Sequence, residues 1–121
     1  HRDCILLSGS THHGDEVYAY SNDNNQLQSL SKSLHENPVG ELVGISRISQ
    51  DLFKALCNYY ENNITNSPNL NYEDCLTALS ESHPIHLHTV EDLIWCEIDD
   101  DKQYNIAVNQ VFPEFKNPHV R

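Results

Sequence analysis

The sequence of 121 residues has few basic side chains and no long apolar run. Lysine and arginine number 7 against 18 aspartate and glutamate residues, so the formal net charge is −11. Such an acidic surface repels the phosphates of nucleic acids and anionic lipids, which argues against general binding to DNA, RNA or membranes. No stretch approaches the roughly 20 apolar residues that span a bilayer. Residues 4–7 are too short a run for a signal-peptide core. We therefore expect a folded cytoplasmic protein.

The cysteines lack the spacing of a zinc motif. The four residues, Cys4, Cys57, Cys75 and Cys96, include no C-x-x-C or other close pair. A thiolate zinc site therefore has little support. In a reducing cytosol, isolated cysteines of this kind pack as small apolar side chains.

Short apolar runs separated by polar turns predict an α/β domain with a mixed sheet and flanking helices. Alternating or β-branched segments predict strands at residues 4–7, 16–20, 27–31, 39–48, 85–90 and 93–98. The polar turn between the second and third segments makes them a hairpin. Apolar residues at helical spacing predict helices that begin after Ser49, after Asn71 and after residues 99–101, where polar or acidic residues supply caps and first-turn charges.

Two details of these elements can be predicted more closely. Gly40 and Gly44 lie in the fourth strand and indicate a bulge or a close backbone approach. The last helix is expected to have an apolar face made of Tyr104, Ala107, Val108 and Val111. The length suits one domain or a piece of one. Because the first apolar run begins three residues after His1, we expect the chain to be an internal segment of a longer protein.

The acidic segment at residues 95–101, WCEIDDD, gives the strongest indication of a functional site. Side chains alternate between the faces of a strand, so Glu97 and Asp99 would share one face with Trp95 where a helix begins. Two carboxylates at a strand end suit Mg²⁺, which leaves its other positions to water and substrate phosphates. The plainer alternative is a helix N-terminus rich in acids, with Glu97 solvated on an edge strand.

Residues 92–107, DLIWCEIDDDKQYNIA, resemble the C-terminal motif of nucleotidyltransferases with a nucleotide-diphospho-sugar transferase fold. An aromatic residue followed by x-E-I-D and a helix ending in alanine is similar to the phosphocholine and aminoethylphosphonate cytidylyltransferases. Other segments follow in the order of that family: GDEV at 14–17, SK at 31–32, GELVGIS at 40–46 and YEDCL at 72–76. The resemblance covers residues 3–112. It implies that residues 1–121 form the C-terminal half of such a domain.

The resemblance implies magnesium-dependent transfer of a nucleotidyl group, cytidylyl in this branch, from CTP to a phosphate or phosphonate monoester such as phosphocholine. Glu97 and Asp99 would bind the Mg²⁺ cofactor, and the ligands would be a nucleoside triphosphate and a small phosphorylated acceptor. This chemistry rests on positioning and metal electrostatics, with little need for a protein nucleophile. The resemblance therefore assigns metal and substrate residues but no catalytic side chain.

The family's glycine-rich loop, which cradles the triphosphate with G-x-G and a basic residue, has no counterpart in these residues. Gly9 is isolated from Gly14 by polar residues, and no lysine or arginine follows it closely. A further metal-binding aspartate at an earlier strand end is also missing. We therefore expect this segment to be inactive alone, with the first half of the domain either outside the sequence or lost.

The resemblance also points to four substrate-binding residues. Tyr72 and Glu73 begin a helix near the acceptor pocket, where an aromatic face and an acid hold an amine. Glu41 would face the acceptor, although Leu42 stands where many members of the branch carry a large aromatic. Lys32 would reach a phosphate. The plainer alternatives are a packed Tyr72, a first-turn acid at Glu73 and a solvated lysine at a hairpin end.

Other classes of function have weaker or different support. His86 and His88 alternate on one strand and could bind zinc, but no third ligand has a recognisable spacing. No nucleophile elbow or Ser-His-Asp order favours hydrolysis. The rival reading is a non-catalytic binding or assembly module. An isolated half-domain would leave a sheet edge and apolar surface for a second copy, or for the missing half, to cover.

Overall fold

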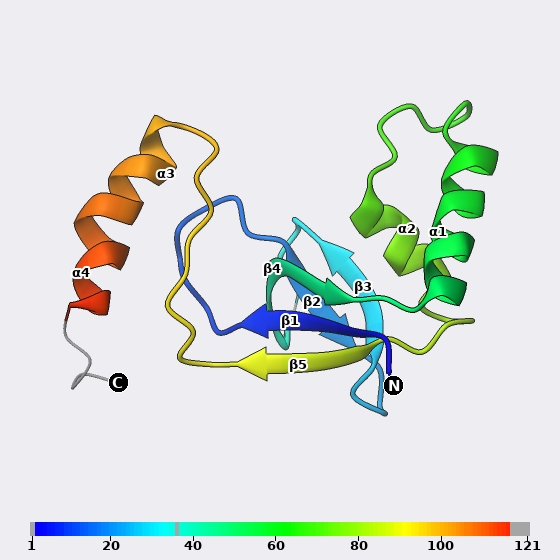
Figure 1. Cartoon of the computed structure of the whole chain (residues 1–121), viewed down its shortest axis with the longest axis horizontal. Coiled ribbons are helices and arrows are strands. Elements are labelled where there is room, and N and C mark those ends of the chain that lie inside the picture. Colours follow the sequence, from blue (N-terminus) through cyan, green and yellow to red (C-terminus); the bar gives the residue numbers. More distant parts are fainter. Residues whose placement is uncertain (1, 36, 117–121) are drawn as a thin grey trace.

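A computed structural model of the chain describes residues 2–35 and 37–116 and contains one five-stranded mixed sheet (Figure 1). The strand order is β3-β2-β4-β1-β5. The strands are β1 (Cys4–Ser8), β2 (Tyr18–Ser21), β3 (Leu27–Ser31), β4 (Gly40–Arg47) and β5 (His86–Val90). The predicted class of α/β with a mixed sheet is confirmed at this level. The nucleotide-diphospho-sugar transferase fold stays a prediction.

The sheet is mixed because β1 has an antiparallel neighbour on one side and a parallel one on the other. It pairs with β4 antiparallel and with β5 parallel. The predicted hairpin of β2 and β3 is confirmed, and its pairing has a register shift between Tyr20 and Ser21. Since parallel neighbours end at the same edge, the segments that follow β1 and β5 leave the sheet together.

The helices α1 (Gln50–Asn63) and α2 (Tyr72–Leu79) lie at the opposite end of the molecule from the C-terminal helices (Figure 1). The predicted caps are confirmed: the Ser49 side chain accepts a hydrogen bond from the Leu52 amide, and Asn71 forms a capping box with Asp74. Within the part of the chain that the structure describes, no helix combines the length and apolarity needed to cross a membrane.

Helix α2 packs against β3 and hydrogen-bonds to its outer edge. The Leu30 amide donates to Thr77 Oγ1 at 2.9 Å, and Ser80 Oγ donates to the Gln28 carbonyl at 3.0 Å. Backbone groups at a sheet edge otherwise invite pairing with another chain. Side chains of α2 and of its C-cap residue Ser80 therefore occupy part of this edge of the sheet.

The core lies between the sheet and the two helices α1 and α2. Ten buried apolar residues form one cluster: Ile5, Leu7, Ala19, Leu27, Leu30, Leu42, Leu52, Leu76, Ile85 and Leu87. All four cysteines are free thiols, and Cys75 is buried. The C-terminal helices contribute no member to this cluster.

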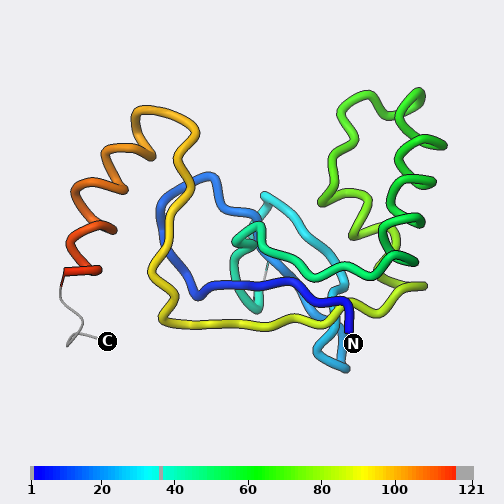
Figure 2. The backbone as a smooth tube through the Cα atoms, in the orientation of Figure 1, coloured from blue at the N-terminus to red at the C-terminus, as the bar shows by residue number. Residues whose placement is uncertain are grey.

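The prediction of a strand at residues 93–98 is wrong. The chain turns at Glu91 and Asp92 after β5 and continues as an unpaired segment up to the last helix. It runs beside the loop that follows β1 (Figure 2), and a Cβ added to Gly9 would lie 2.5 Å from the Glu91 carbonyl oxygen. The apolar run resembles a strand, but no neighbouring strand offers it a ladder of hydrogen bonds.

The apolar face predicted for the last helix is only partly correct. The segment consists of α3 (Asp101–Ile106), a π-helical turn η1 (Ala107–Val111) and α4 (Phe112–Phe115). Val111 is buried, whereas Tyr104 is 56% and Val108 46% exposed. A π-turn adds a residue per turn and so rotates the residues beyond it relative to an α-helix. This rotation separates Val111 from the two residues expected beside it.

The two glycines of β4 behave as predicted. A Cβ at Gly40 would lie 2.7 Å from the Ser8 carbonyl oxygen, so the backbones of β1 and β4 approach closely there. Gly44 has φ of +96°, in the region that side chains disfavour. Both residues lie in the strand that carries Glu41 toward the site.

Candidate functional site

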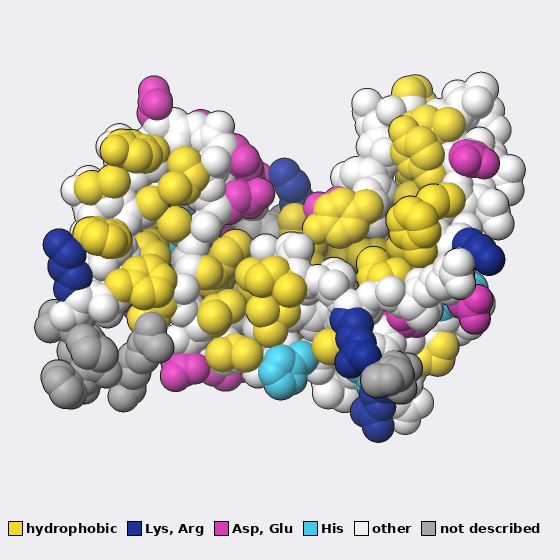
Figure 3. Space-filling view, viewed as in Figure 1, with side chains coloured by type: hydrophobic (Ala, Val, Ile, Leu, Met, Phe, Trp, Pro, Cys, Tyr) yellow, Lys and Arg dark blue, Asp and Glu magenta, His cyan; other side chains and the backbone are white. Residues whose placement is uncertain are grey.

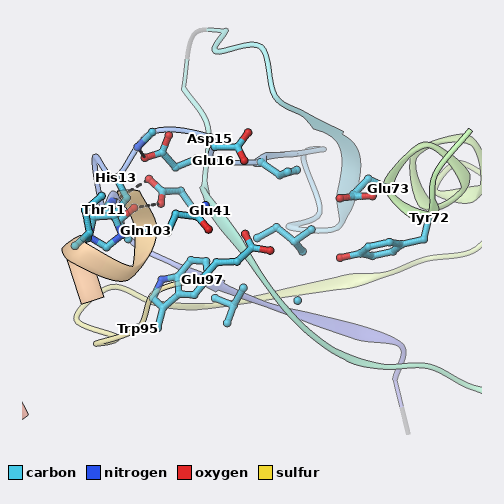
Figure 4. Close-up of a pocket in the computed structure, with 16 residues that line it drawn as sticks. Thr11, His13, Asp15, Glu16, Glu41, Tyr72, Glu73, Trp95, Glu97 and Gln103 are labelled. Atoms are coloured by element: carbon cyan, nitrogen blue, oxygen red, sulfur yellow. Dashed lines mark hydrogen bonds between the residues drawn. The ribbon is translucent and has the colours of Figure 1, made fainter. Parts of the chain in front are cut away.

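A small acidic cavity lies where the loop after β1, strand β4, the start of α2 and the residues before α3 meet (Figure 4). Its volume is about 90 Å³, which suits a metal ion or a small head group and is below the roughly 300 Å³ of a pocket for a larger ligand. Its lining includes acids and aromatics from all these segments: Asp15, Glu16, Glu41, Tyr72, Glu73, Trp95 and Glu97.

Glu97 reaches the cavity from the unpaired segment before α3, and its carboxylate points toward Tyr72 and Glu73 (Figure 4). Loss of surrounding water raises the pKa of Glu97 above its usual value, and the neighbouring Asp99 carboxylate raises it further. Asp15 adds to this rise and Lys32 opposes it. Since the Asp99 charge acts on Glu97, the two carboxylates lie close enough for one cation to neutralise both.

Tyr72 and Glu73 enter the cavity because the capping box at Asn71 fixes the first turn of α2. Burial raises the pKa of the Tyr72 phenol, and the charges of Glu73 and Glu97 raise it further. The phenol therefore stays protonated beside two carboxylates. An aromatic ring with acids around it attracts organic ammonium groups as well as metal ions.

Glu41 is buried at the base of the cavity, and its carboxylate turns toward the loop after β1 (Figure 4). Oε2 accepts a hydrogen bond from the Thr11 amide at 2.9 Å, and Oε1 accepts one from Thr11 Oγ1 at 2.6 Å. The Glu41 carboxylate therefore contacts the loop after β1, whereas the Glu97 carboxylate points to the opposite wall, at the start of α2.

Lys32 lies beside the cavity and forms an ion pair with Asp15 at 3.0 Å. This hydrogen bond and the charge of Asp15 raise the pKa of Lys32, helped by Glu73 and Glu97. Both side chains are more than half exposed, so the pair contributes little to stability. Its effect is to place a cation at the edge of the acidic site, where Lys102 Nζ also lies near Gly14.

The structure brings most of the predicted site residues together. Glu41, Tyr72, Glu73 and Glu97 line the cavity. Asp99 does not line it but lies next to Glu97, and the Asp99 amide donates a hydrogen bond to Gln103 Oε1. Lys32 likewise stands outside the lining and reaches it through Asp15.

Sequence reasoning missed Thr11, His13 and Gln103, which also line the cavity. The polar loop that follows the first buried strand was the available signal for Thr11 and His13, because ligands gather at strand ends in α/β sheets. Trp95 was expected to share a face with Glu97 and does line the same cavity, although the strand that suggested it does not form. Its indole N–H is buried and has no hydrogen-bond partner among the described residues.

A larger cavity of about 630 Å³ adjoins the first and shares Thr11, His13 and Trp95 with it. Its other walls come from residues 91–94 and from the C-terminal helices. This volume lies in the range of pockets that take larger organic ligands. The loop after β1 is therefore a wall of both cavities.

The sequence was also compared with models of known protein families. No family model matches the chain.

The carboxylates fit a hard cation better than zinc. Within residues 2–35 and 37–116, no cluster of three or more His, Cys, Asp or Glu side chains could hold a metal ion. Zinc requires such a protein set, whereas Mg²⁺ takes one or two carboxylates with water and phosphate oxygens. The pair Glu97 and Asp99, whose mutual repulsion a cation would relieve, matches the second pattern.

Proposed function

We propose that this chain supplies the magnesium and acceptor site of a nucleotidyltransferase with a nucleotide-diphospho-sugar transferase fold. The reaction would transfer a nucleotidyl group, cytidylyl by resemblance, to a phosphate or phosphonate monoester such as phosphocholine. The observation that carries the proposal is the convergence of Glu97, Tyr72 and Glu73 on one small acidic cavity. They come from segments far apart in sequence, and the same residues carry the resemblance.

Each predicted residue has a role that its surroundings support. Glu97 and Asp99 would hold Mg²⁺, which would neutralise phosphate charge when bound. Tyr72 and Glu73 would receive the ammonium group of the acceptor, because the cavity has room for such a group and is negative. Lys32, held beside the cavity by Asp15, would meet the acceptor's phosphate.

The chemistry is an in-line displacement. An oxygen of the acceptor phosphate attacks the α-phosphorus of the nucleoside triphosphate, a new phosphorus–oxygen bond forms, and the bond to the leaving pyrophosphate breaks. The attacking oxygen is already anionic, so no proton has to be removed. What the chain must do is orient the acceptor and keep its charges balanced.

Pyrophosphate release tests the proposal. The assay uses the chain alone and the chain extended by any sequence that precedes it in its gene, with CTP, Mg²⁺ and a panel of phosphocholine, aminoethylphosphonate and sugar phosphates. We expect release from the extended protein with one acceptor and none from the 121 residues alone. Silence across the panel from a folded extended protein would contradict the proposal.

Asp99→Asn gives the sharper comparison. The change is nearly isosteric and removes the second carboxylate, so magnesium-dependent release should fall at least about 100-fold, the scale of losing one strong electrostatic contact in a transition state. Asp23→Asn, at an exposed turn between β2 and β3, is the matched control. Retained activity in Asp99→Asn would remove Asp99 from the site.

The alternative, a non-catalytic assembly module, is favoured by a separate observation. Four large apolar side chains on the C-terminal helices are about half exposed: Tyr104, Val108, Phe112 and Phe115. Apolar side chains gather over this part of the face in Figure 3, whereas acids line the nearby notch. Exposed patches of this kind often mark contact surfaces. Sedimentation of the chain alone tests this, since a module should self-associate and Val108→Glu should prevent it.

A further inference from the structure

Glu41 differs from the other acids of the cavity in what its carboxylate contacts. It extends from β4, where its backbone pairs with Ser8 of β1 and Tyr18 of β2. The residue is 3% exposed. Both carboxylate oxygens accept hydrogen bonds from Thr11. A group fixed in the middle of the sheet is thus joined through its side chain to a loop.

That loop has a strained backbone. His12 and Asp15 have φ of 58° and 64°, and Gly14 between them has φ of 84°. Left-handed conformations at non-glycine residues persist only where surrounding contacts impose them. The Gly14 amide donates to Glu16 Oε1 at 2.6 Å, which is a contact within the loop itself. The bonds from Thr11 to Glu41 tie the loop to the sheet.

The same loop forms walls of the site. Thr11 and His13 line both cavities, and Asp15 lines the smaller one and holds Lys32. A loop freed from Glu41 would move these walls and the cation together. The position of the loop therefore decides the shape and the charge of the site.

We propose that Glu41 is a positioning residue: its buried carboxylate holds Thr11, and through it the loop at residues 11–16, in place as a wall of both cavities. Both of its oxygens accept hydrogen bonds from Thr11, and the carboxylate turns away from Tyr72 and Glu73 (Figure 4). In this role Glu41 acts on the ligand through the loop. The positioning role differs from the substrate-binding role expected from the sequence, and the binding measurement below separates the two. Its effect on ligand binding rests on the proposed function, whereas the hold on the loop does not.

Amide hydrogen exchange tests the hold on the loop. In Glu41→Ala, the protection of residues 11–16 should fall at least about 10-fold, because two hydrogen bonds to a buried charge are lost. Glu41→Gln should restore most of it, since the amide oxygen can still accept from the Thr11 amide. Glu61→Ala, which removes an exposed acid from α1, is the control for lost charge. Unchanged protection of the loop in Glu41→Ala would overturn the proposal.

Ligand binding separates positioning from direct contact. Trp95 is the single tryptophan of the chain and lines both cavities, so its fluorescence can report binding of Mg²⁺ and of phosphocholine. Glu41→Ala and Thr11→Val should weaken binding, and the double variant should be no weaker than Glu41→Ala, because both act on one contact. If the losses of affinity in the two single variants add in the double variant, Glu41 contacts the ligand directly. Direct contact would also follow if Glu41→Gln weakened binding as much as Glu41→Ala while the loop stayed protected from exchange. If the unaltered chain binds neither probe, the proposed function fails, and hydrogen exchange still decides the role of Glu41.

Discussion

Replacing Thr77 with valine should destabilise the protein through the edge of its sheet. Thr77 Oγ1 accepts a hydrogen bond of 2.9 Å from the Leu30 amide, on the outer edge of β3. Valine has nearly the same volume and a similar helix propensity, but it cannot accept this bond. The substitution therefore removes one hydrogen bond from the interface of α2 and β3 and leaves the packing almost unchanged.

The expected decrease in the free energy of unfolding follows from the partial burial of this hydrogen bond. An amide left without a partner costs about 1–3 kcal/mol when buried, and because the Thr77–Leu30 contact is partly buried we expect about 1–2 kcal/mol. The entropy of unfolding is about 2.1 cal/mol/K per residue. For 121 residues, 1 kcal/mol corresponds to about 4 °C, so the Tm should fall by about 4–8 °C.

Thermal unfolding followed by circular dichroism measures this change, with Thr77→Ser as the partner variant. Serine keeps the hydroxyl and loses a methyl group, so the hydrogen bond predicts that stability falls in the order Thr, Ser, Val. If packing alone mattered, valine would be at least as stable as threonine and serine the weakest. That second order would refute the reasoning. Thr65→Val, in an exposed loop, should shift the Tm little.

Three further predictions concern the walls of the site. Asn71→Ala removes the capping box of α2 and should lower the free energy of unfolding, measured in urea, by about 0.5–2 kcal/mol. Asn69→Ala, in the preceding loop, is the control. Equal losses in the two variants would refute the role of the cap. The folded protein holds the Glu97 proton more tightly than the unfolded chain, because partial loss of water around this largely exposed side chain and the charge of Asp99 raise the Glu97 pKa. The stability that Glu97 contributes is therefore present at acid pH and lost as the pH rises through its raised pKa, so Glu97→Gln should unfold at a higher temperature than the unaltered protein at neutral pH but not in acid. A difference independent of pH would contradict this assignment. Gly44→Ala forces a side chain into φ of +96° and should cost about 1–2 kcal/mol although nothing obstructs the Cβ, whereas an equally stable variant would show that the strand relaxes there.

The sequence was sufficient to predict those helices and turns whose signals lie within a few residues of one another. A helix was predicted to begin after Asn71, and α2 does begin at Tyr72, because the capping box joins Asn71 to Asp74, only three residues further on. The hairpin of β2 and β3 was likewise predictable from alternation on both sides of a polar turn. Local sequence also indicated the acids of the site, since Glu97 and Asp99 stand together in the chain.

Tertiary structure decided which of these locally preferred elements form and which distant residues they contact. Residues 93–98 have the composition of a strand, but a strand needs a neighbouring backbone, and this segment instead runs beside the loop after β1. The same arrangement joins Glu41 to Thr11, 30 residues apart in sequence, in a contact that no local pattern indicates. Local sequence thus determined caps, turns and alternation, because those depend on near neighbours. The cavity depended on contacts between distant segments, which only the packing of the sheet could bring together.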